Sequence, residues 1–493
     1  MIADHLAALQ VVVPLIAAPI IVLVRRGAFA WAVTMLASAA SLAIALALLV
    51  QVREVGVISY AIGSWAPPWG IEYRVDIFNA FVLVLIGLLA TIGGPYAWRS
   101  FATEVPEDQH YLGYAMFCLC LAGLLGITIT GDAFNLFVFL EISSLSTYVL
   151  IALGRDRRAL VAAYQYLIMG TIGATFYIIG VGLLYLMTGT LNLHDLAGRL
   201  GDVVHARPVL AALAFITVGI SLKLALFPLH FWLPNAYAYA PSVVSAFLAG
   251  TATKVAIYVL IRFYFTVFGK SAIFDDLPTQ DIFLVLSIAA MFVASVAAAY
   301  QDNLRHLLAY SSLGQIGYIT FGIALANQAG LTGAIVHLFN HGVTKAALFL
   351  LAGCIWFRVR SVRFADLAGV ARVMPLTCAG IVVGGLSLIG APVTAGFVTK
   401  WYLVLGAIDT GHWWIVFLPV VSSLIAIWYM WRFVEVAYFR EPGPALVGVK
   451  EAPAVLLLPA YVLVALTVYF GVDTSFTVGT ASRAAEMLLG GTR

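Results

Sequence analysis

Four of the chain's six lysines lie inside long apolar stretches, whereas none of its twenty arginines does: these lysines are Lys223, Lys254, Lys345 and Lys400. A charged side chain at the centre of a bilayer costs about 2.5–3.5 kcal/mol on insertion scales. Arginine stays protonated, but the pKa of a lysine shifts readily on desolvation, by up to about 3–5 units. Because the basic residues inside the apolar stretches are lysines and not arginines, the sequence predicts amines that gain and lose protons within a membrane.

The first of these lysines precedes a predicted break in its helix. Residues 221–241 read SLKLALFPLHFWLPNAYAYAP, with Lys223 followed by Pro228. Proline lacks an N–H and its ring clashes with the preceding turn, so the helix kinks or ends there. Broken helices occur at membrane depth where they line a cavity or are covered by protein. The pattern predicts an ion path with His230 as an auxiliary group; the alternative is a structural kink beside a lysine that extends to the membrane surface.

A second break is predicted in GGLSLIGAPVTAGFVTKWYLV, where glycines flank Pro392 and Lys400 follows. Two broken helices, one in each half of the chain and each with a lysine, are typical of transporters built from inverted repeats. Lys254, in AGTATKVAIYVL, lies in the apolar stretch that follows the first break.

A polar stripe is predicted in HLFNHGVTKAALF, where His337, His341 and Lys345 have the spacing i, i+4 and i+8. These positions share one helix face over about 12 Å. Because histidine titrates near neutrality, the stripe is typical of a proton relay. A polar seam between helices is an alternative. A zinc site is another, but zinc would need a third ligand and the lysine would repel it, so we assign no metal.

One carboxylate, Glu141 in FNLFVFLEISSLSTYVLI, lies well inside an apolar stretch. Ser311 and Ser312, in RHLLAYSSLGQIGY, are auxiliary candidates because their hydroxyl groups can hold water. Glu435 lies near the end of its stretch, three residues after Arg432, and we expect a structural ion pair between them.

The composition is that of a polytopic membrane protein. Of 493 residues, 63% are hydrophobic and 10% are charged, against about 25% charged in an ordinary soluble domain. The net charge of +3 includes no basic cluster, so nucleic acid is excluded as a partner. None of the four cysteines forms a CxxC pair, so neither an iron–sulfur site nor a disulfide framework is predicted, and we expect no cofactor.

Fourteen stretches are long and apolar enough to span a bilayer. They cover approximately residues 7–24, 29–51, 74–97, 110–130, 133–153, 160–187, 209–229, 240–262, 279–300, 304–326, 330–356, 375–402, 412–439 and 452–472. We expect an all-α fold with two inverted five-helix repeats, formed by spans 4–8 and 9–13, with spans 7 and 12 broken. The first apolar run lacks a small-residue cleavage site, so we expect it to be a retained span.

The predicted organisation has four parts, which are residues 1–105 with three N-terminal helices, 106–265 and 266–440 as the two translocating halves, and 441–493 with span 14 and an external tail. An even number of spans places both termini on one side. Loops on one side hold 14 of the arginines and lysines, and the opposite loops and tails hold 8, with Arg493 among them. The first set is therefore expected to be cytoplasmic and both termini outside.

The segments that hold these residues together resemble the antiporter-like subunits of respiratory complex I. The same superfamily includes multisubunit Mrp-type Na+/H+ antiporters and membrane-bound hydrogenases. The resemblance rests on LKLALFPLHFWLPNAYAYAPSVVSAFLAG, RHLLAYSSLGQIGY, HLFNHGVTKAALFLLAG and the lysine of span twelve, and covers approximately residues 75–435. NLFVFLEISSLSTYVLIAL and the chain length resemble the D-type subunit of the Mrp antiporters.

This resemblance implies a role for each charged group. Glu141 and Lys223 would form a coupling ion pair, and Lys254 would link it to the centre. The stripe on span eleven would carry protons between the halves, and Lys400 would serve the exit to the outside. The implied setting is a bacterial inner membrane, where the chain works with other subunits of a hetero-oligomeric complex and moves protons in exchange for Na+.

Three functions are open at this point. The first is a proton-translocating subunit of a cation/H+ antiporter, which is a transporter subunit and not an enzyme in its own right. The second is a non-redox, proton-pumping subunit of an NADH:quinone oxidoreductase or a membrane-bound hydrogenase, whose partner subunits would hold the redox groups. The third is a membrane scaffold or receptor, against which the four interior lysines argue.

Overall fold

The computed structural model describes residues 3–201, 203–411 and 413–490. Arg493 and the two chain ends, to which the predicted orientation refers, lie outside the described residues. The α-helices are α1 Leu6–Val24, α2 Gly27–Val55, α3 Ile77–Glu104, α4 His110–Ile129, α5 Ala133–Ala152, α6 Arg157–Thr188, α7 Leu193–Leu200, α8 Arg207–Leu224, α9 Leu233–Tyr239, α10 Ser242–Ile261, α11 Thr279–Ala299, α12 Leu304–Ala324, α13 Gln328–Val359, α14 Pro375–Ile389, α15 Ala395–Asp409, α16 Phe417–Val434, α17 Ala454–Val472 and α18 Ser475–Leu488. The strands are β1 Ile58–Ala61 and β2 Glu72–Val75, which pair antiparallel.

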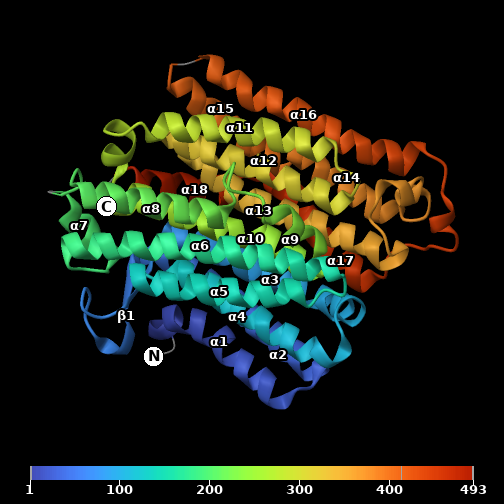
Figure 1. Cartoon of the computed structure of the whole chain (residues 1–493), viewed down its shortest axis with the longest axis horizontal. Coiled ribbons are helices and arrows are strands. Elements are labelled where there is room, and N and C mark those ends of the chain that lie inside the picture. Colours follow the sequence, from blue (N-terminus) through green and yellow to red (C-terminus); the bar gives the residue numbers. More distant parts are fainter. Residues whose placement is uncertain (1–2, 202, 412, 491–493) are drawn as a thin grey trace.

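The long helices run side by side along one direction (Figure 1). Thirteen helices of the described part are long and apolar enough to cross a membrane. They match thirteen of the predicted spans, and the remaining span, 375–402, is divided between α14 and α15. The start of α1 and the end of α18 lie at the same end of the bundle (Figure 1). The prediction of an all-α polytopic membrane protein is confirmed.

Both predicted helix breaks are present. α8 ends at Leu224, and residues 225–232 separate it from α9, so span seven is shorter than the predicted 209–229. α14 ends at Ile389, and Gly390 follows with φ +89°, a left-handed conformation that glycine adopts without steric cost. Pro228 and Pro392 both lie in these connections, where the absence of an N–H does not interrupt a helix.

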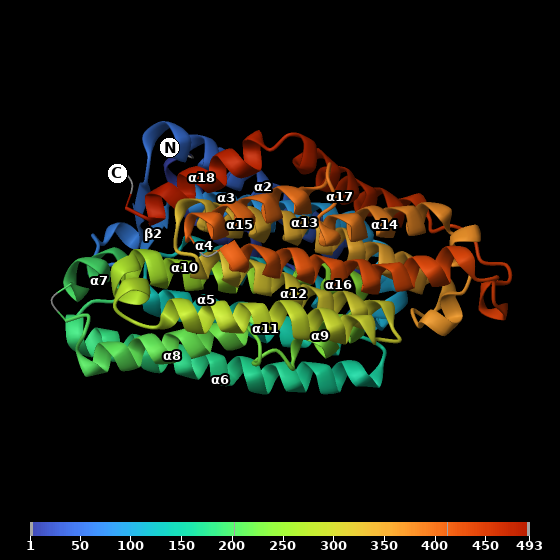
Figure 2. The same cartoon turned by 90° about the horizontal axis from the view of Figure 1, so that it is seen from above.

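α13 lies at the centre of the bundle (Figure 2). It contacts α10, α12, α15, α17 and α18. Two glycines face each other within its contact with α10. A Cβ added to Gly342 would lie 2.8 Å from the carbonyl oxygen of Gly250, and a Cβ added to Gly250 would lie 3.1 Å from the carbonyl oxygen of Gly342. Small residues of this kind let membrane helices approach closely. Lys254 and His341 are therefore brought close to the crossing point.

The predicted halves, 106–265 and 266–440, have the same order of long helices. Each has three helices, then a broken helix, then a fifth, namely α4, α5, α6, α8–α9 and α10 in the first and α11, α12, α13, α14–α15 and α16 in the second. This order agrees with two repeats, and their inverted relation stays a prediction.

Two segments differ from the expected organisation. The predicted external tail forms α18 over Ser475–Leu488, and this helix contacts α13 and α3. Residues of the first part form the β1–β2 hairpin between α2 and α3, which the span pattern did not predict. Short elements of this kind contain polar and aromatic residues and are not predicted by the span pattern, because only long apolar runs indicate a membrane span clearly.

Two expectations about charged groups are wrong. Glu435 pairs with Arg440 at 2.9 Å. Arg432 instead pairs with Asp302 at 2.7 Å, because the fold places the end of α11 next to Arg432. Arginine is also not confined to loops. Arg262 and Arg305 are buried at helix ends and paired with carboxylates.

The Asp76–Arg262 ion pair provides a test of the fold. Both carboxylate oxygens accept hydrogen bonds from Arg262, and both side chains are at least 90% buried. Arg262→Met should leave the Asp76 carboxylate buried without its cation, at a cost of about 3–5 kcal/mol. We expect the unfolding temperature of the purified chain in detergent, followed by tryptophan fluorescence, to fall by several degrees.

Arg440→Met is the matched control, because Arg440 and Glu435 form an exposed pair, and such pairs contribute little to stability. Equal shifts for the two variants would show that the buried pair does not stabilise the fold.

Candidate functional site

Lys223 lies in the last turn of α8 and has two polar neighbours on α5. Its Nζ donates a hydrogen bond to Ser144 Oγ at 2.6 Å and lies 3.6 Å from Glu141 Oε1. Glu141 and Ser144 are three residues apart and therefore share one face of α5. The Lys223 side chain is 4% exposed and that of Glu141 is 25% exposed. The predicted Glu141–Lys223 ion pair is thus possible at this separation, with a hydroxyl group as a second partner for the amine.

A small cavity lies between Lys223 and α10. Lys223, Ser144 and Tyr166 line it on one side, and Ala252 and Ala256 on the other. It has room for about one water molecule beside hydroxyl and amine groups, which are the partners that a buried water needs. The cavity therefore joins the first lysine to the helix that holds the second.

Lys254 is fully buried on α10. Its Nζ donates to the carbonyl oxygen of Ala249 and lies 3.3 Å from Thr253 Oγ1. Within the described ranges it forms no ion pair with a carboxylate. A fully buried amine held only by neutral oxygen atoms is less costly to deprotonate than one held by a carboxylate.

On α13 the two histidines stack on each other. The ring centroids of His337 and His341 are 5.3 Å apart and the ring planes are 6° from parallel. None of their four ring nitrogens has a hydrogen-bond partner among the described side chains and backbone groups. Both rings line a small cavity with room for about one water molecule. Lys345 turns toward α12, where its Nζ donates to Ser311 Oγ and, at 2.8 Å, to the carbonyl oxygen of Leu308.

The charges of the neighbouring lysines act on this histidine pair. Lys254 and Lys345 interact electrostatically with both rings, and Lys400 interacts with His337. Lys254 also acts electrostatically on Lys345. The stripe on α13 therefore lies between the lysine of α10 and the lysine of α15.

Lys400, on α15, reaches back across the break to the end of α14. Its Nζ donates to the carbonyl oxygens of Ile389 at 2.6 Å and Leu388 at 3.2 Å, and to Ser423 Oγ at 2.6 Å. The amine also lies 4.7 Å from the ring centroid of Tyr318. The carbonyl end of a helix carries a partial negative charge that favours a cation. Gly390 has no side chain that would occupy the space of the lysine's methylene groups.

The auxiliary candidates divide into two groups. Ser311 accepts a hydrogen bond from Lys345, whereas Ser312 donates to the carbonyl oxygen of Leu308 at 3.0 Å and forms no hydrogen bond with a lysine amine of the described residues. His230 stacks on Phe227 and Phe231, with centroid distances of 5.4 and 4.8 Å, and lies in the connection that follows α8. His230 and Ser312 are thus outside the row of interior groups.

We define the interior row as the set of buried and half-buried titratable groups that this region places on α5, α8, α10, α13 and α15, where α8 contacts α10 and α13 contacts both α10 and α15. Its members are Glu141, Lys223, Lys254, His341, Lys345, His337 and Lys400.

The row has neutral partners that sequence reasoning missed, namely Ser144, Ser423 and Tyr318. Ser144 had a detectable signal, because it lies one turn after Glu141 on the same helix face. Ser423 and Tyr318 are polar groups within apolar spans, but nothing in their local sequence relates them to Lys400, which comes from another helix.

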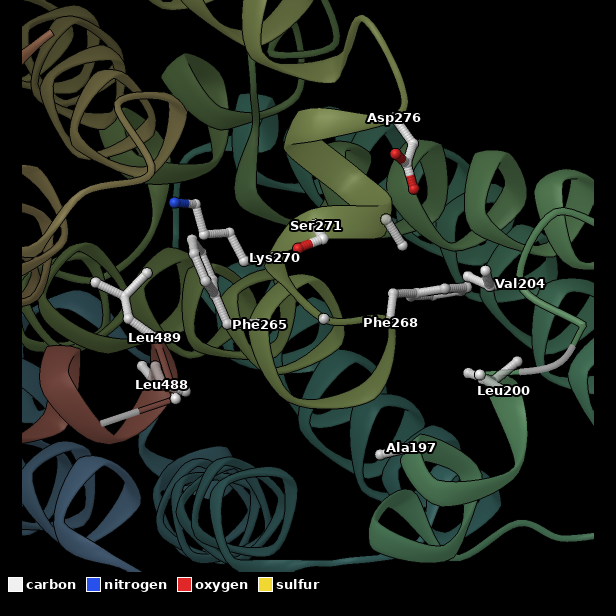
Figure 3. Close-up of a pocket in the computed structure, with 14 residues that line it drawn as sticks. Ala197, Leu200, Val204, Phe265, Phe268, Lys270, Ser271, Asp276, Leu488 and Leu489 are labelled. Atoms are coloured by element: carbon white, nitrogen blue, oxygen red, sulfur yellow. The ribbon is translucent and has the colours of Figure 1, made fainter. Parts of the chain in front are cut away.

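A separate hollow lies where η4, a π-helical segment over Arg262–Val267, approaches α7 and the end of α18 (Figure 3). Phe265, Phe268, Lys270 and Leu488 are among its lining residues. None of the row residues lines it, so it is not part of the site.

Comparison with known proteins shows which family shares this arrangement. Residues 130–426 match the family described as "NADH:quinone oxidoreductase/Mrp antiporter, TM". This segment includes every member of the interior row.

Two relatives and one solved structure are similar over most of the chain. The N-type subunit of the NADH-quinone oxidoreductase of Desulforudis audaxviator is 43% identical over 416 residues, which is 82% of each chain. The D-type subunit of the Na(+)/H(+) antiporter of Alkalihalophilus pseudofirmus is 28% identical and covers 95% of this chain and 94% of its own. A chain of the Mrp complex from Dietzia sp. superposes with a TM-score of 0.91 at 27% identity, over 99% of this chain and 98% of that one.

The resemblance inferred from the motifs is confirmed by these matches, which extend over more than half of the chain. The protein is a member of the NADH:quinone oxidoreductase/Mrp antiporter family of membrane proteins.

Proposed function

We propose that this chain is the proton-translocating subunit of a multisubunit Na+/H+ antiporter. The observation that carries the proposal is the interior row, in which four amines, two imidazoles and one carboxylate are buried or half-buried on contacting helices from both halves of the bundle. Titratable groups at membrane depth are costly and typically mark proton paths. The similarity to the D-type antiporter subunit and to a chain of an Mrp complex supports the assignment.

The proposed step begins at Lys223. When the Glu141 carboxylate is near, its negative charge favours the protonated amine. When the carboxylate moves away, Ser144 remains as a neutral partner and the amine releases its proton more easily. Moving one charge across 100 mV costs about 2.3 kcal/mol. A change of one unit in pKa corresponds to about 1.36 kcal/mol, so a change of a few units is large enough to drive the step.

The released proton then passes through Lys254 to the stripe on α13 and from His337 to Lys400, which we assign to the exit. The exit faces the outside of the plasma membrane of a bacterium, with both termini on that side. The chain acts there within a hetero-oligomeric complex, in keeping with the multisubunit assembly that contains its structural neighbour.

A second candidate is the proton-pumping arm of an NADH:quinone oxidoreductase. It is favoured by the 43% identity to the N-type subunit of such an enzyme. The interior row would act in the same way, but redox partner subunits would drive it.

Loss of either member of the first ion pair should stop transport. We expect Glu141→Ala and Lys223→Ala to reduce ΔpH-driven and Na+-driven proton exchange at least tenfold in membrane vesicles that contain the complete complex, measured by acridine-orange fluorescence. Lys270→Ala is the matched control, since Lys270 is exposed outside the row. Wild-type exchange by both row variants would rule out the proposed step.

The variant Lys400→Arg distinguishes two roles of Lys400, that of a proton carrier and that of a structural cation. Arginine can still bind the carbonyl oxygens of Leu388 and Ile389, but it does not release its proton. We therefore expect Lys400→Arg to be as inactive as Lys400→Met in the same vesicles, although the complex assembles. Recovery of exchange by arginine would indicate that only the positive charge matters.

The two candidate functions differ in what drives the protons. For an antiporter we expect Na+ addition to dequench acridine orange in vesicles that receive neither NADH nor quinone. Proton movement that requires NADH, together with co-purifying flavin and iron–sulfur subunits, would support the oxidoreductase and contradict the antiporter.

A further inference from the structure

A polar hollow lined by arginine lies at the end of the bundle where α9 ends and α12 begins, away from the interior row. Its arginines are Arg155, Arg158, Arg305, Arg360 and Arg363. Its carboxylates are Glu104, Asp156 and Asp366. The lining comes from the ends of α3 and α9, the α5–α6 connection, the start of α12 and the end of α13. The hollow therefore lies between the two halves of the chain.

The carboxylates of the hollow already have partners. Asp156 accepts hydrogen bonds from Arg158 Nε and Nη2, and this contact lowers the pKa of Asp156. Asp366 accepts from Ser361 Oγ at 2.6 Å. Glu104 accepts from the backbone N–H and the hydroxyl of Ser242, at 3.0 and 2.9 Å.

Three of the five guanidinium groups form no ion pair with a carboxylate in the part of the chain that the structure describes, namely those of Arg155, Arg360 and Arg363. Those of Arg360 and Arg363 form no ion pair and donate no hydrogen bond within the described residues, and Arg360 instead lies over the ring of Trp356 at 5.0 Å. Among the described residues, the guanidinium of Arg155 donates only to the carbonyl oxygen of Val105. Arg305, by contrast, is buried and already has partners: its Nη2 pairs with Glu104 and donates to Ser242 Oγ, and its Nη1 donates to the carbonyl oxygens of Ala238 and Ala240. The hollow thus has five arginines against three carboxylates, and its three arginines without a carboxylate partner are exposed.

We propose that this hollow binds a phosphate group, carried either by the headgroup of an anionic phospholipid or by free phosphate. Guanidinium groups match phosphate oxygens in bidentate geometry. Basic hollows between membrane helices on the cytoplasmic side bind anionic headgroups, and tryptophan is frequent at the headgroup level. Trp356 lines this hollow. A phosphate bound here links the α5–α6 connection to the end of α13 and so holds the two halves together at this end.

The test uses the purified full chain in detergent after removal of bound lipid. Native mass spectrometry measures retention of phosphatidylglycerol against phosphatidylcholine, and calorimetry measures binding of inorganic phosphate. We expect the double variant Arg360→Gln, Arg363→Gln to weaken binding at least tenfold, since two charges are removed. Arg358→Gln is the matched control, because Arg358 is exposed on the same helix end and donates to the carbonyl oxygen of Glu451 instead of lining the hollow.

Binding of phosphatidylglycerol alone would identify a headgroup as the ligand, and binding of inorganic phosphate alone would identify a free anion. Wild-type binding by the double variant, or equal weakening by Arg358→Gln, would overturn the proposal. So would the absence of binding of both probes to the wild-type chain.

A second measurement needs no variant. Phenylglyoxal modifies accessible arginines, and mass spectrometry of the digested chain reports each position. We expect inorganic phosphate or phosphatidylglycerol to slow modification of Arg360 and Arg363 and to leave Arg358 unchanged. Equal rates with and without these probes would contradict the site.

Discussion

An amine buried in an apolar helix bundle must be given oxygen partners, and this requirement explains much of the interior. Each interior lysine has at least one: Ser144 for Lys223, Ala249 for Lys254, Leu308 for Lys345 and Ile389 for Lys400. These partners are neutral hydroxyl or carbonyl groups, which can satisfy an amine in either protonation state. Of these four lysines, only Lys223 also lies beside a carboxylate of the described residues. In the proposed mechanism, Lys223 responds to the moving charge of Glu141 and the other members of the row pass the proton on.

At the two helix breaks, the carbonyl groups that the helix ends leave free have different hydrogen-bond donors. At the end of α14, Leu388 and Ile389 accept hydrogen bonds from Lys400. At the end of α8, the carbonyl of Leu222 instead accepts from Trp232 Nε1, at 2.9 Å. Both arrangements satisfy groups that a helix end leaves without partners. The second break therefore holds a cation, whereas the first leaves Lys223 free to contact α5.

Permanently charged groups are placed apart from the row. Arg262 with Asp76 and Arg305 with Glu104 are buried near helix ends, where each guanidinium meets a carboxylate. Removal of one partner from such a pair is strongly unfavourable, so these pairs are suited to holding helices in place. The interior therefore combines a static frame of arginine–carboxylate pairs with a row of groups that can titrate.

The sequence by itself determined the membrane class, the spans and both breaks. Long apolar runs and proline act through local chain properties, which the order of residues displays directly. It also determined the members of the row, since a lysine or histidine within an apolar helix is conspicuous whatever its neighbours are. The placement of His337, His341 and Lys345 on one face followed from helical spacing alone.

Tertiary structure decided which groups contact one another. Ser311 meets Lys345 and Ser312 does not, although the two serines are adjacent in the chain. Arg432 pairs with Asp302, which lies far away in sequence, and not with the nearby Glu435. The packing of α18 and the arginine-lined hollow also arise from segments that are distant in sequence. Such contacts depend on how whole helices cross, as at Gly250 and Gly342, and no local pattern of residues contains that information.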